Sequence, residues 1–439
     1  MQPRARIRPV RRDDLDRLEE WRSPATAPST TWCCSAGCGG SERDRHRSRS
    51  HLVTATNGAD GTEGANGEGN DGRDPAGEPA PGPAWEHPMR GTTDWVQQGT
   101  VRAELEADEV RTLAPWAAKA SMSAGRGQAE PEDPVRTCWM RDLDRIIFSR
   151  AMMRAHGKTQ SFIPAFSEGP AAGRQGGPYI GDHYVTRATH MQHTARIAAT
   201  IAQALALNVP LATAIATGHD LGHSCFGHGG EAALQEVAPN GFDHAQQGAR
   251  LLTLLEPRNL TAEVLGGIAC HSWKHEPPGT LEGMCARLAD RIAYLTADLT
   301  DALRAGVLAG IDEVPPAVRH ALGETTSDMV GTLVEDVVRH SRGQPQVVQG
   351  DGCAEAMATL RTFMFDRVYL RPEAERQTDR ARRLLTDLYG HYLRHPDAMP
   401  MGASLASDPV EQQAVDAIAG MTDRYALAAW SAAFAPGAD

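Results

Sequence analysis

The chain has 439 residues, which is enough for one large helical domain or for two to three average domains. Its 44 basic and 56 acidic residues give a formal net charge of −12, which argues against a protein that coats nucleic acid or binds a membrane through a basic surface. The sequence contains no apolar run of about 18 residues, so we expect no membrane-spanning helix.

The first 91 residues are not typical of a packed domain. Residues 55–84 contain eight Gly and four Pro but no Leu, Ile, Val or Phe, so burial cannot offset the conformational entropy of this segment. Cys33, Cys34 and Cys38 lack a second ligand pair at zinc-site spacing, which leaves a structural zinc as the minor alternative. We therefore expect residues 1–91 to be a disordered, low-complexity extension, which is either functional or translated from a start assigned too early.

Helical patterns follow from about residue 92. The segment 188–206 places apolar side chains on one helical face, Asn208 is expected to cap this helix at its C-terminus, and Pro210 suits the first turn of a helix over 209–221. Further helices are predicted over 243–255, 281–308, 315–340, 354–369, 372–394 and 409–430. The turn-rich run 164–181 is expected to be a loop. Alternating strand patterns are scarce, so the predicted fold is all-α, with one domain over 92–439.

The cysteines indicate the cellular compartment. Eight cysteines occur without the spacing of a disulfide framework, and the N-terminus lacks the apolar region of a secretory signal. We therefore expect a protein of the reducing cytoplasm.

Two familiar motifs are present only in part. His156–Thr159 ends like a phosphate-binding P-loop, but Met152 stands where the first glycine belongs and no apolar strand precedes it. His219 and His223 have the spacing of a zinc-protease motif, but Asp220 occupies the position of the general-base glutamate. The sequence therefore predicts neither a P-loop nucleotide site nor a zinc protease.

Histidine is concentrated in the middle of the chain, where 93 consecutive residues hold nine of the 17. The strongest signal is TGHDLGHSCFGHGGE at 217–231, in which His219 and Asp220 are adjacent. Adjacent helical residues diverge by about 100°, so an ion held by both needs ligands from other helices, for which His190 and Asp290 are candidates. Two imidazoles and two carboxylates suit an octahedral-type divalent ion, Mg or Mn first, with Fe, Co or Zn as alternatives. Such an ion would acidify a bound water.

An ordered series of stretches is similar to the deoxyguanosine triphosphate triphosphohydrolase-like (dGTPase-like) family, a branch of the HD-domain metal-dependent phosphohydrolases. The matching stretches run from about residue 138 to 428: DLDRIIFS at 142–149, KTQSF at 158–162, GDHYVTRATH at 181–190, HDLGHSCFGHGGE at 219–231, GFDH at 241–244, NLT at 259–261, LADRIAYLTADL at 288–299, FMFDRVYL at 363–370 and AIAGMTDRYAL at 417–427. The resemblance implies an HD-domain helical fold, with an HD core at about 183–305 and a C-terminal helical region over 310–439.

The resemblance also assigns roles in the chemistry. It implies four metal ligands: His190, His219, Asp220 and Asp290. It further implies that His228 and Glu231 act as a pair that positions or activates the attacking group, with Glu231 fixing the imidazole of His228. His244 resembles the proton donor to the leaving oxygen, a role that suits a group with a pKa near 7. His193, His223 and His271 are expected behind the ligands or on the substrate side.

A third set of residues resembles the family's substrate contacts: Gln160, Arg187, Arg291, Tyr294 and Asp298. Arg187 and Arg291 correspond to phosphate contacts, for which a planar guanidinium is suited, and Lys158 is a weaker candidate for the same role. The other three correspond to sugar contacts, and a tyrosine ring beneath the sugar would exclude a 2′-hydroxyl. The alternative is that Arg291 and Asp298 are solvated helix charges and that Tyr294 is an ordinary core residue.

The activity implied by the resemblance is metal-dependent hydrolysis of a deoxynucleoside triphosphate, dGTP by default, to a deoxynucleoside and inorganic triphosphate. Two alternatives stay open: an HD-type phosphohydrolase of another nucleotide, and a non-catalytic nucleotide-sensing HD module. A homo-oligomer is expected, with no membrane partner and no nucleic-acid partner except a single-stranded effector.

Overall fold

The computed structural model describes residues 100–161 and 184–434, which belong to one compact unit, Pro88–Asp439. Every regular element in this part of the chain is helical, and its β features are two isolated bridges, Arg126 with Thr261 and Thr159 with Thr186. This confirms the all-α prediction. No described helix is long and apolar enough to cross a membrane. The predictions for residues 1–91 and for the loop at 164–181 lie outside the described residues.

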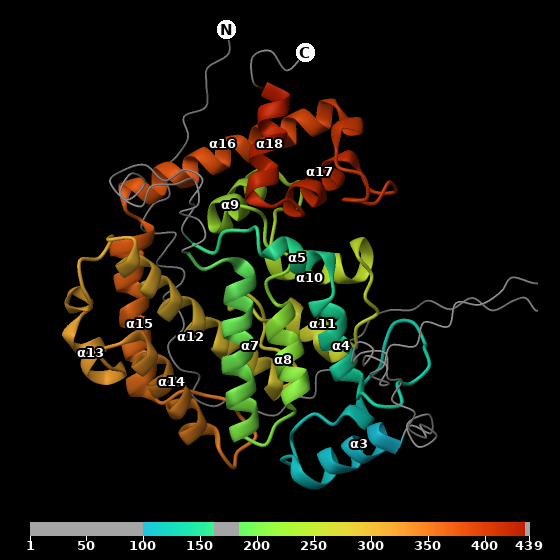
Figure 1. Ribbon diagram of the computed structural model, residues 1–439, viewed down its shortest axis with the longest axis vertical. Coiled ribbons are helices and arrows are strands. Elements are labelled where there is room, and N and C mark those ends of the chain that lie inside the picture. The colour runs from blue at the N-terminus through green and yellow to red at the C-terminus, as the bar shows by residue number, and fades with distance from the viewer. Residues whose placement is uncertain (1–99, 162–183, 435–439) are drawn as a thin grey trace, which may run out of the picture. The chain divides into compact units, whose positions relative to one another are not determined.

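The elements keep the labels of Figure 1. The α-helices are α3 (Thr100–Thr112), α4 (Cys138–Ile147), α5 (Arg150–Ala155), α7 (Arg187–Ala204), α8 (Val209–Gly218), α9 (Gly227–Val237), α10 (His244–Arg250), α11 (Ala262–Ala269), α12 (Leu281–Arg304), α13 (Pro316–Leu322), α14 (Thr326–Ser341), α15 (Asp351–Met364), α16 (Pro372–Arg394), α17 (Val410–Ala419) and α18 (Asp423–Phe434). Two π-helical segments, η5 (Leu251–Leu255) and η7 (Phe365–Tyr369), continue α10 and α15. Short 3-10 turns are η2 (Ala120–Met122), η6 (Ile311–Glu313) and η8 (Pro396–Ala398).

Three helices pack together at the centre of the unit. Helices α7, α8 and α12 contact one another, and Figure 1 shows α7 and α8 side by side with α12 next to them. Helix α8 is apolar on nearly all sides, and its buried side chains include Leu211 and Ile215. This pattern is typical of a helix enclosed by neighbours. This packing brings the middle of α12, the first turns of α7 and the end of α8 to one place.

A second apolar core lies in the C-terminal region. Its buried residues come mainly from α9, α16, α17 and α18, and include Leu234, Tyr389 and Ile418, together with Phe226 just before α9. Helix α16 packs against α9, α17 and α18, which gather at the top of Figure 1. Helix α9, which follows the histidine-rich motif, is therefore built into this second core.

Several predicted helices are confirmed, and two are interrupted. The predictions for 188–206, 209–221, 243–255, 281–308, 354–369 and 372–394 correspond to α7, α8, α10 with η5, α12, α15 with η7, and α16. The predicted helix 315–340 is two helices, because Gly323 adopts φ +117°, where a Cβ would lie 2.4 Å from Cβ of Asp328. The predicted helix 409–430 likewise ends at Ala419 and restarts at Asp423.

The turn between α7 and α8 differs from the prediction. Asn208 is the N-cap of α8, where its side chain accepts the amide N–H of Leu211, and not the C-cap of α7. The chain leaves α7 through Ala206, which adopts a left-handed conformation with φ 54°. Pro210 lies in the first turn of α8 as predicted.

Candidate active site

The adjacent pair His219 and Asp220 lies at the end of α8 rather than in the middle of a helix. Helix α8 ends at Gly218, His219 is its C-cap, and Asp220 belongs to the turn that follows. Gly222 lets this turn approach α10, because a Cβ at this position would lie 2.1 Å from the carbonyl oxygen of His244 and 2.2 Å from the amide nitrogen of Gly248. The absence of a side chain at Gly222 therefore brings the N-terminus of α10 against the turn.

The four predicted metal ligands lie together. Nε2 of His190 on α7 is 3.0 Å from Oδ1 of Asp290 on α12 and 3.6 Å from Oδ2 of Asp220. Nε2 of His219 is 3.5 Å from Oδ1 of both carboxylates. Helix α7, helix α12 and the turn after α8 thus direct two imidazoles and two carboxylates at one site, in which His190, His219 and Asp220 are buried and Asp290 is partly exposed.

The donor atoms in this cluster fit a cation. Nδ1 of His219 lies 2.7 Å from the carbonyl oxygen of Ala216, which can only accept, so this contact fixes the ring proton on Nδ1. The lone pair of Nε2 then faces the carboxylates of Asp220 and Asp290, and this buried nitrogen has no hydrogen-bond partner in the described part of the chain. Burial opposes charge on His219, yet the two carboxylates raise its pKa to about 9, so the position attracts positive charge. The cluster is able to hold a divalent metal ion.

Asp220 also faces a second group of histidines. Its Oδ1 atom lies 3.3 Å from Nε2 of His223, 3.8 Å from Nε2 of His271 and 3.9 Å from Nε2 of His244, while Oδ2 accepts a 2.7 Å hydrogen bond from Arg187. Burial alone would raise the pKa of Asp220, but the neighbouring histidine and arginine charges hold it well below its ordinary value. Asp220 therefore stays ionised and joins the two groups.

Glu231 is paired with His244 and not, as predicted, with His228. Oε1 of Glu231 lies 2.9 Å from Nδ1 of His244, and the ring of His244 stacks on that of His223 with centroids 3.9 Å apart. His228 is exposed, with its ring centroid 6.1 Å from that of His223. Burial opposes charge on His244, but the hydrogen bond and charge of Glu231 raise its pKa. Glu231 thus orients the predicted proton donor.

His271 is a member of the site that sequence reasoning left without a role. Its Nδ1 lies 2.7 Å from the carbonyl oxygen of Ile268, and its Nε2 lies 3.1 Å from Nε2 of His244. Since Nδ1 of His244 is engaged by Glu231, the two Nε2 atoms can form a hydrogen bond only when one ring carries an additional proton. The histidine excess was the sequence signal for His271, whereas His244 was assigned through the resemblance of the stretch at 241–244.

Two of the three predicted sugar contacts carry buried acceptor atoms without a partner among the described residues. Oδ2 of Asp298 accepts the hydroxyls of Tyr369 at 2.6 Å and Ser161 at 2.7 Å, whereas its Oδ1 is buried without a partner among the described residues. Oε1 of Gln160 is likewise buried without a hydrogen-bond partner among the described residues. Tyr294 lies on α12 one turn before Asp298 and is partly buried against the main core. Sequence reasoning missed Tyr369, although its stretch FMFDRVYL was part of the resemblance.

The predicted phosphate contacts are already engaged to different degrees. Arg187 is buried and binds Asp220 and the carbonyl oxygen of Gln160, at 2.7 and 3.1 Å. The guanidinium of Arg291 lies 4.0 Å from the ring centroid of Trp273, and its Nε is buried without a partner in the described residues. Lys158 is buried and donates to backbone carbonyl oxygens, so it holds the chain rather than facing a ligand.

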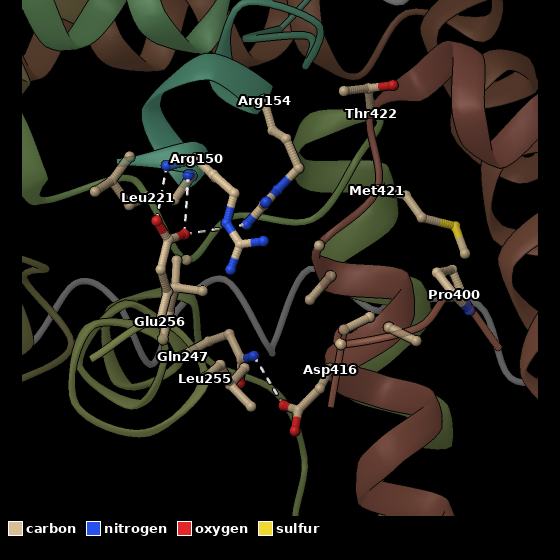
Figure 2. A pocket seen from close by; sticks show the side chains of 18 of the residues that line it. Arg150, Arg154, Leu221, Gln247, Leu255, Glu256, Pro400, Asp416, Met421 and Thr422 are labelled. Atoms are coloured by element: carbon tan, nitrogen blue, oxygen red, sulfur yellow. Dashed lines mark hydrogen bonds and ion pairs between the residues drawn. The ribbon is translucent and has the colours of Figure 1, made fainter. Parts of the chain in front are cut away.

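A separate pocket, shown in Figure 2, lies between α5, α10 and the segment 416–425. The carboxylate of Glu256 accepts the amide N–H groups of Arg150 and Ala151 there, and Gln247 donates to Asp416. None of the four predicted metal ligands lines this pocket. The His/Asp cluster therefore lies outside the lining of this pocket.

The chain matches known proteins over most of its length. The HD domain matches residues 187–295, and the phosphohydrolase-associated domain matches residues 347–432. A deoxyguanosinetriphosphate triphosphohydrolase-like protein from Desulfatibacillum aliphaticivorans is 39% identical over 361 residues, covering 77% of this chain and 99% of the relative. Proteins of the same description from Caldanaerobacter subterraneus subsp. tengcongensis and Deinococcus radiodurans are 40% and 33% identical, covering 76% and 74% of this chain and 96% and 97% of the relatives.

The chain belongs to the deoxyguanosinetriphosphate triphosphohydrolase-like family. Its HD domain begins at Arg187 and ends at Leu295, so it contains all four predicted metal ligands. As a member of the deoxyguanosinetriphosphate triphosphohydrolase-like family, the protein is a metal-binding hydrolase of the HD type. The phosphohydrolase-associated domain runs from the segment before α15 into α18 and so includes most of the second core.

Proposed function

We propose that the protein hydrolyses deoxynucleoside triphosphates, dGTP by default, to a deoxynucleoside and inorganic triphosphate. The observation that carries this proposal is the contact of Asp220 with both groups: it lies beside His190 and His219 on one side and within 3.9 Å of His244 on the other. A cation site and an oriented acid–base residue thereby meet at one carboxylate. The names of the curated relatives support the choice of substrate.

The proposed metal ligands are His190, His219, Asp220 and Asp290, and the proposed ion is Mg or Mn, with Fe, Co or Zn as alternatives. An ion held there would supply Lewis acidity and lower the pKa of a bound water. The four residues can hold it because each directs a ring nitrogen or a carboxylate oxygen at the same site, and binding the ion would release any proton on those nitrogens.

The protein's own side chains supply proton transfer. Hydrolysis at the α-phosphorus expels the 5′-oxygen of the nucleoside, a poor leaving group that benefits from protonation. We assign this proton to Nε2 of His244, since Glu231 engages Nδ1 and so directs Nε2 toward Asp220. His228 lies exposed on the first turn of α9, where it is available to the attacking group.

Substrate contacts follow from the unpartnered atoms. Oδ1 of Asp298 and Oε1 of Gln160 are buried acceptors that a sugar hydroxyl would satisfy, and leaving such atoms unpaired is costly. Tyr294 would pack beneath the sugar and exclude a 2′-hydroxyl. Arg291 is the better-placed phosphate contact, because Arg187 is largely engaged by Asp220. We further propose a cytoplasmic homo-oligomer, for which native mass spectrometry that finds only monomer would be contrary evidence.

A product analysis tests the proposal. Purified protein is incubated with each deoxynucleoside triphosphate and Mg or Mn, and the products are separated by ion-exchange chromatography. Deoxynucleoside with intact triphosphate is the expected result. Phosphate or pyrophosphate as the first product would contradict the proposal and favour another nucleotide phosphohydrolase, and binding without turnover would favour a sensing module.

A further inference from the structure

One carboxylate of the C-terminal region holds two segments of the site. Asp423 begins α18 and is 7% exposed. Its Oδ1 accepts the amide N–H of Phe226 at 2.8 Å, and its Oδ2 accepts both the amide N–H of Thr159 at 3.1 Å and the hydroxyl of Thr159 at 2.5 Å. The residues that it binds come immediately before Gly227, where α9 begins, and immediately before Gln160.

Further hydrogen bonds join the same segments. The ammonium group of Lys158 donates to the carbonyl oxygens of His223 and Ala419, and the amide N–H of Asp423 donates to the carbonyl oxygen of Gly157 at 3.0 Å. A Cβ on Gly157 would lie 2.9 Å from Cγ2 of Thr422, so the two chains are in close contact. The segment 157–159 and the segment 419–423 are therefore bound at several points.

The loop before α9 needs such support. Phe226 and Gly227 both adopt left-handed conformations, with φ 60° and 54°, and a non-glycine residue keeps this conformation only where its surroundings enforce it. The Phe226 side chain is 1% exposed in the second core, and its amide N–H is held by Asp423. A Cβ on Gly227 would lie 2.6 Å from the carbonyl oxygen of Gln160, so the loop also contacts the other segment that Asp423 holds.

We propose that Asp423 is a positioning residue of the active site. By fixing Phe226 and Thr159 at once, it sets the start of α9, and with it Glu231, in register with Gln160. Asp423 acts through the backbone, so the phosphohydrolase-associated region supplies a part of the catalytic scaffold. The kinetic consequence rests on the proposed function.

The chain contains a matched control. Asp142 on α4 is also buried, and its Oδ2 accepts the amide N–H and the hydroxyl of Thr261 at 2.9 and 2.7 Å, while its Oδ1 accepts from Arg126. It thus binds a threonine in the same way as Asp423, with an arginine in place of the second backbone amide, but does not bind the loop before α9. Asp142→Asn therefore shows how far amide exchange and kcat change when a buried, hydrogen-bonded carboxylate is removed elsewhere in the fold.

The experiment compares Asp423→Asn with Asp142→Asn by hydrogen exchange and by kinetics. In Asp423→Asn we expect faster amide exchange in peptides covering 157–161 and 223–231, a fall in kcat of about tenfold or more, and unchanged bound metal. In Asp142→Asn we expect both peptides and kcat to stay as in the unmodified protein. Unchanged exchange in those two peptides of Asp423→Asn, or equal kcat losses in the two variants, would overturn the inference. If the unmodified protein has no turnover, the proposed function fails, and the exchange comparison alone still decides whether Asp423 holds the loop.

Discussion

Nε2 of His244 lies 3.1 Å from Nε2 of His271, and the other nitrogen of each ring is engaged, by Glu231 and by the carbonyl oxygen of Ile268. His271 therefore restricts the rotation of the ring to which we assign proton donation. The pair lies beside Asp220, so a change at His271 acts on catalysis without removing one of the four proposed metal ligands.

We expect His271→Gln to lower kcat about tenfold or more, because His244 loses the partner that fixes Nε2. Metal content measured by elemental analysis should stay unchanged. His193→Gln on α7 is the control, since His193 is exposed and outside the contacts of this pair, and it should keep kcat within about twofold. Equal kcat values for His271→Gln and the unmodified protein would remove His271 from the site.

Chelation should lower the melting temperature as well as the activity. An ion that binds only the folded chain stabilises it by mass action, so removing the ion with EDTA should lower Tm, and added Mg or Mn should restore both Tm and turnover. Asp220→Ala should bind no metal and should show the same Tm with and without EDTA, as measured by scanning calorimetry. Metal retained by Asp220→Ala at the stoichiometry of the unmodified protein would refute the proposed ligand set.

Tyr369 should contribute to substrate affinity. Its hydroxyl donates to Asp298, so Tyr369→Phe leaves Oδ2 of that buried carboxylate with one donor fewer and loosens the wall proposed for the sugar. We expect KM for the deoxynucleoside triphosphate to rise about tenfold, equivalent to roughly 1.4 kcal/mol, with a smaller change in kcat. Tyr389→Phe removes a hydroxyl from the second core and should leave KM unchanged. A KM for Tyr369→Phe equal to that of the control would place the sugar elsewhere.

Asp301 should make the protein less stable as the pH rises. Burial raises the pKa of Asp301 to about 6 from an ordinary 3.8, with a further contribution from the charge of Asp298. Between about pH 4 and 6 the folded state therefore binds more protons than the unfolded state, so stability falls through this window and is constant above it. Asp301→Asn removes the effect and keeps an oxygen for the amide N–H of Val185.

We expect Asp301→Asn to melt about 2 °C higher than the unmodified protein at pH 7.5 and at the same temperature near pH 4. Asp351→Asn, at an exposed position, should show no such pH-dependent difference. If Asp301→Asn and the unmodified protein differ in Tm by the same amount at pH 4 and at pH 7.5, the charge of Asp301 is not the cause of that difference.

The resemblance was enough to name the four proposed metal ligands, because each lies in a stretch that matches the family. It did not show that their side chains meet. His190 and Asp290 are 100 positions apart in the chain, and they lie beside His219 because α7 and α12 pack on α8.

The pairing of Glu231 was beyond sequence reasoning. Its partner depends on how α9 packs into the second core and on the close approach that Gly222 allows to α10. Helix α9 itself was not predicted, because glycines at its start are ordinarily a sign that a helix ends. Asn208 was misassigned for a related reason: the same residue type caps either end of a helix, and only the backbone at Ala206 decides which.

Helix α9, which carries Glu231, belongs to one apolar core, and the helices that carry the proposed metal ligands belong to the other. Retention of the proposed ion and orientation of the proposed proton donor therefore have separate mechanical supports. A lesion confined to the C-terminal core would leave the proposed ion in place beside a His244 ring that Glu231 no longer orients. Such a protein would still bind metal and still be inert, so metal content alone is a poor proxy for competence in this enzyme.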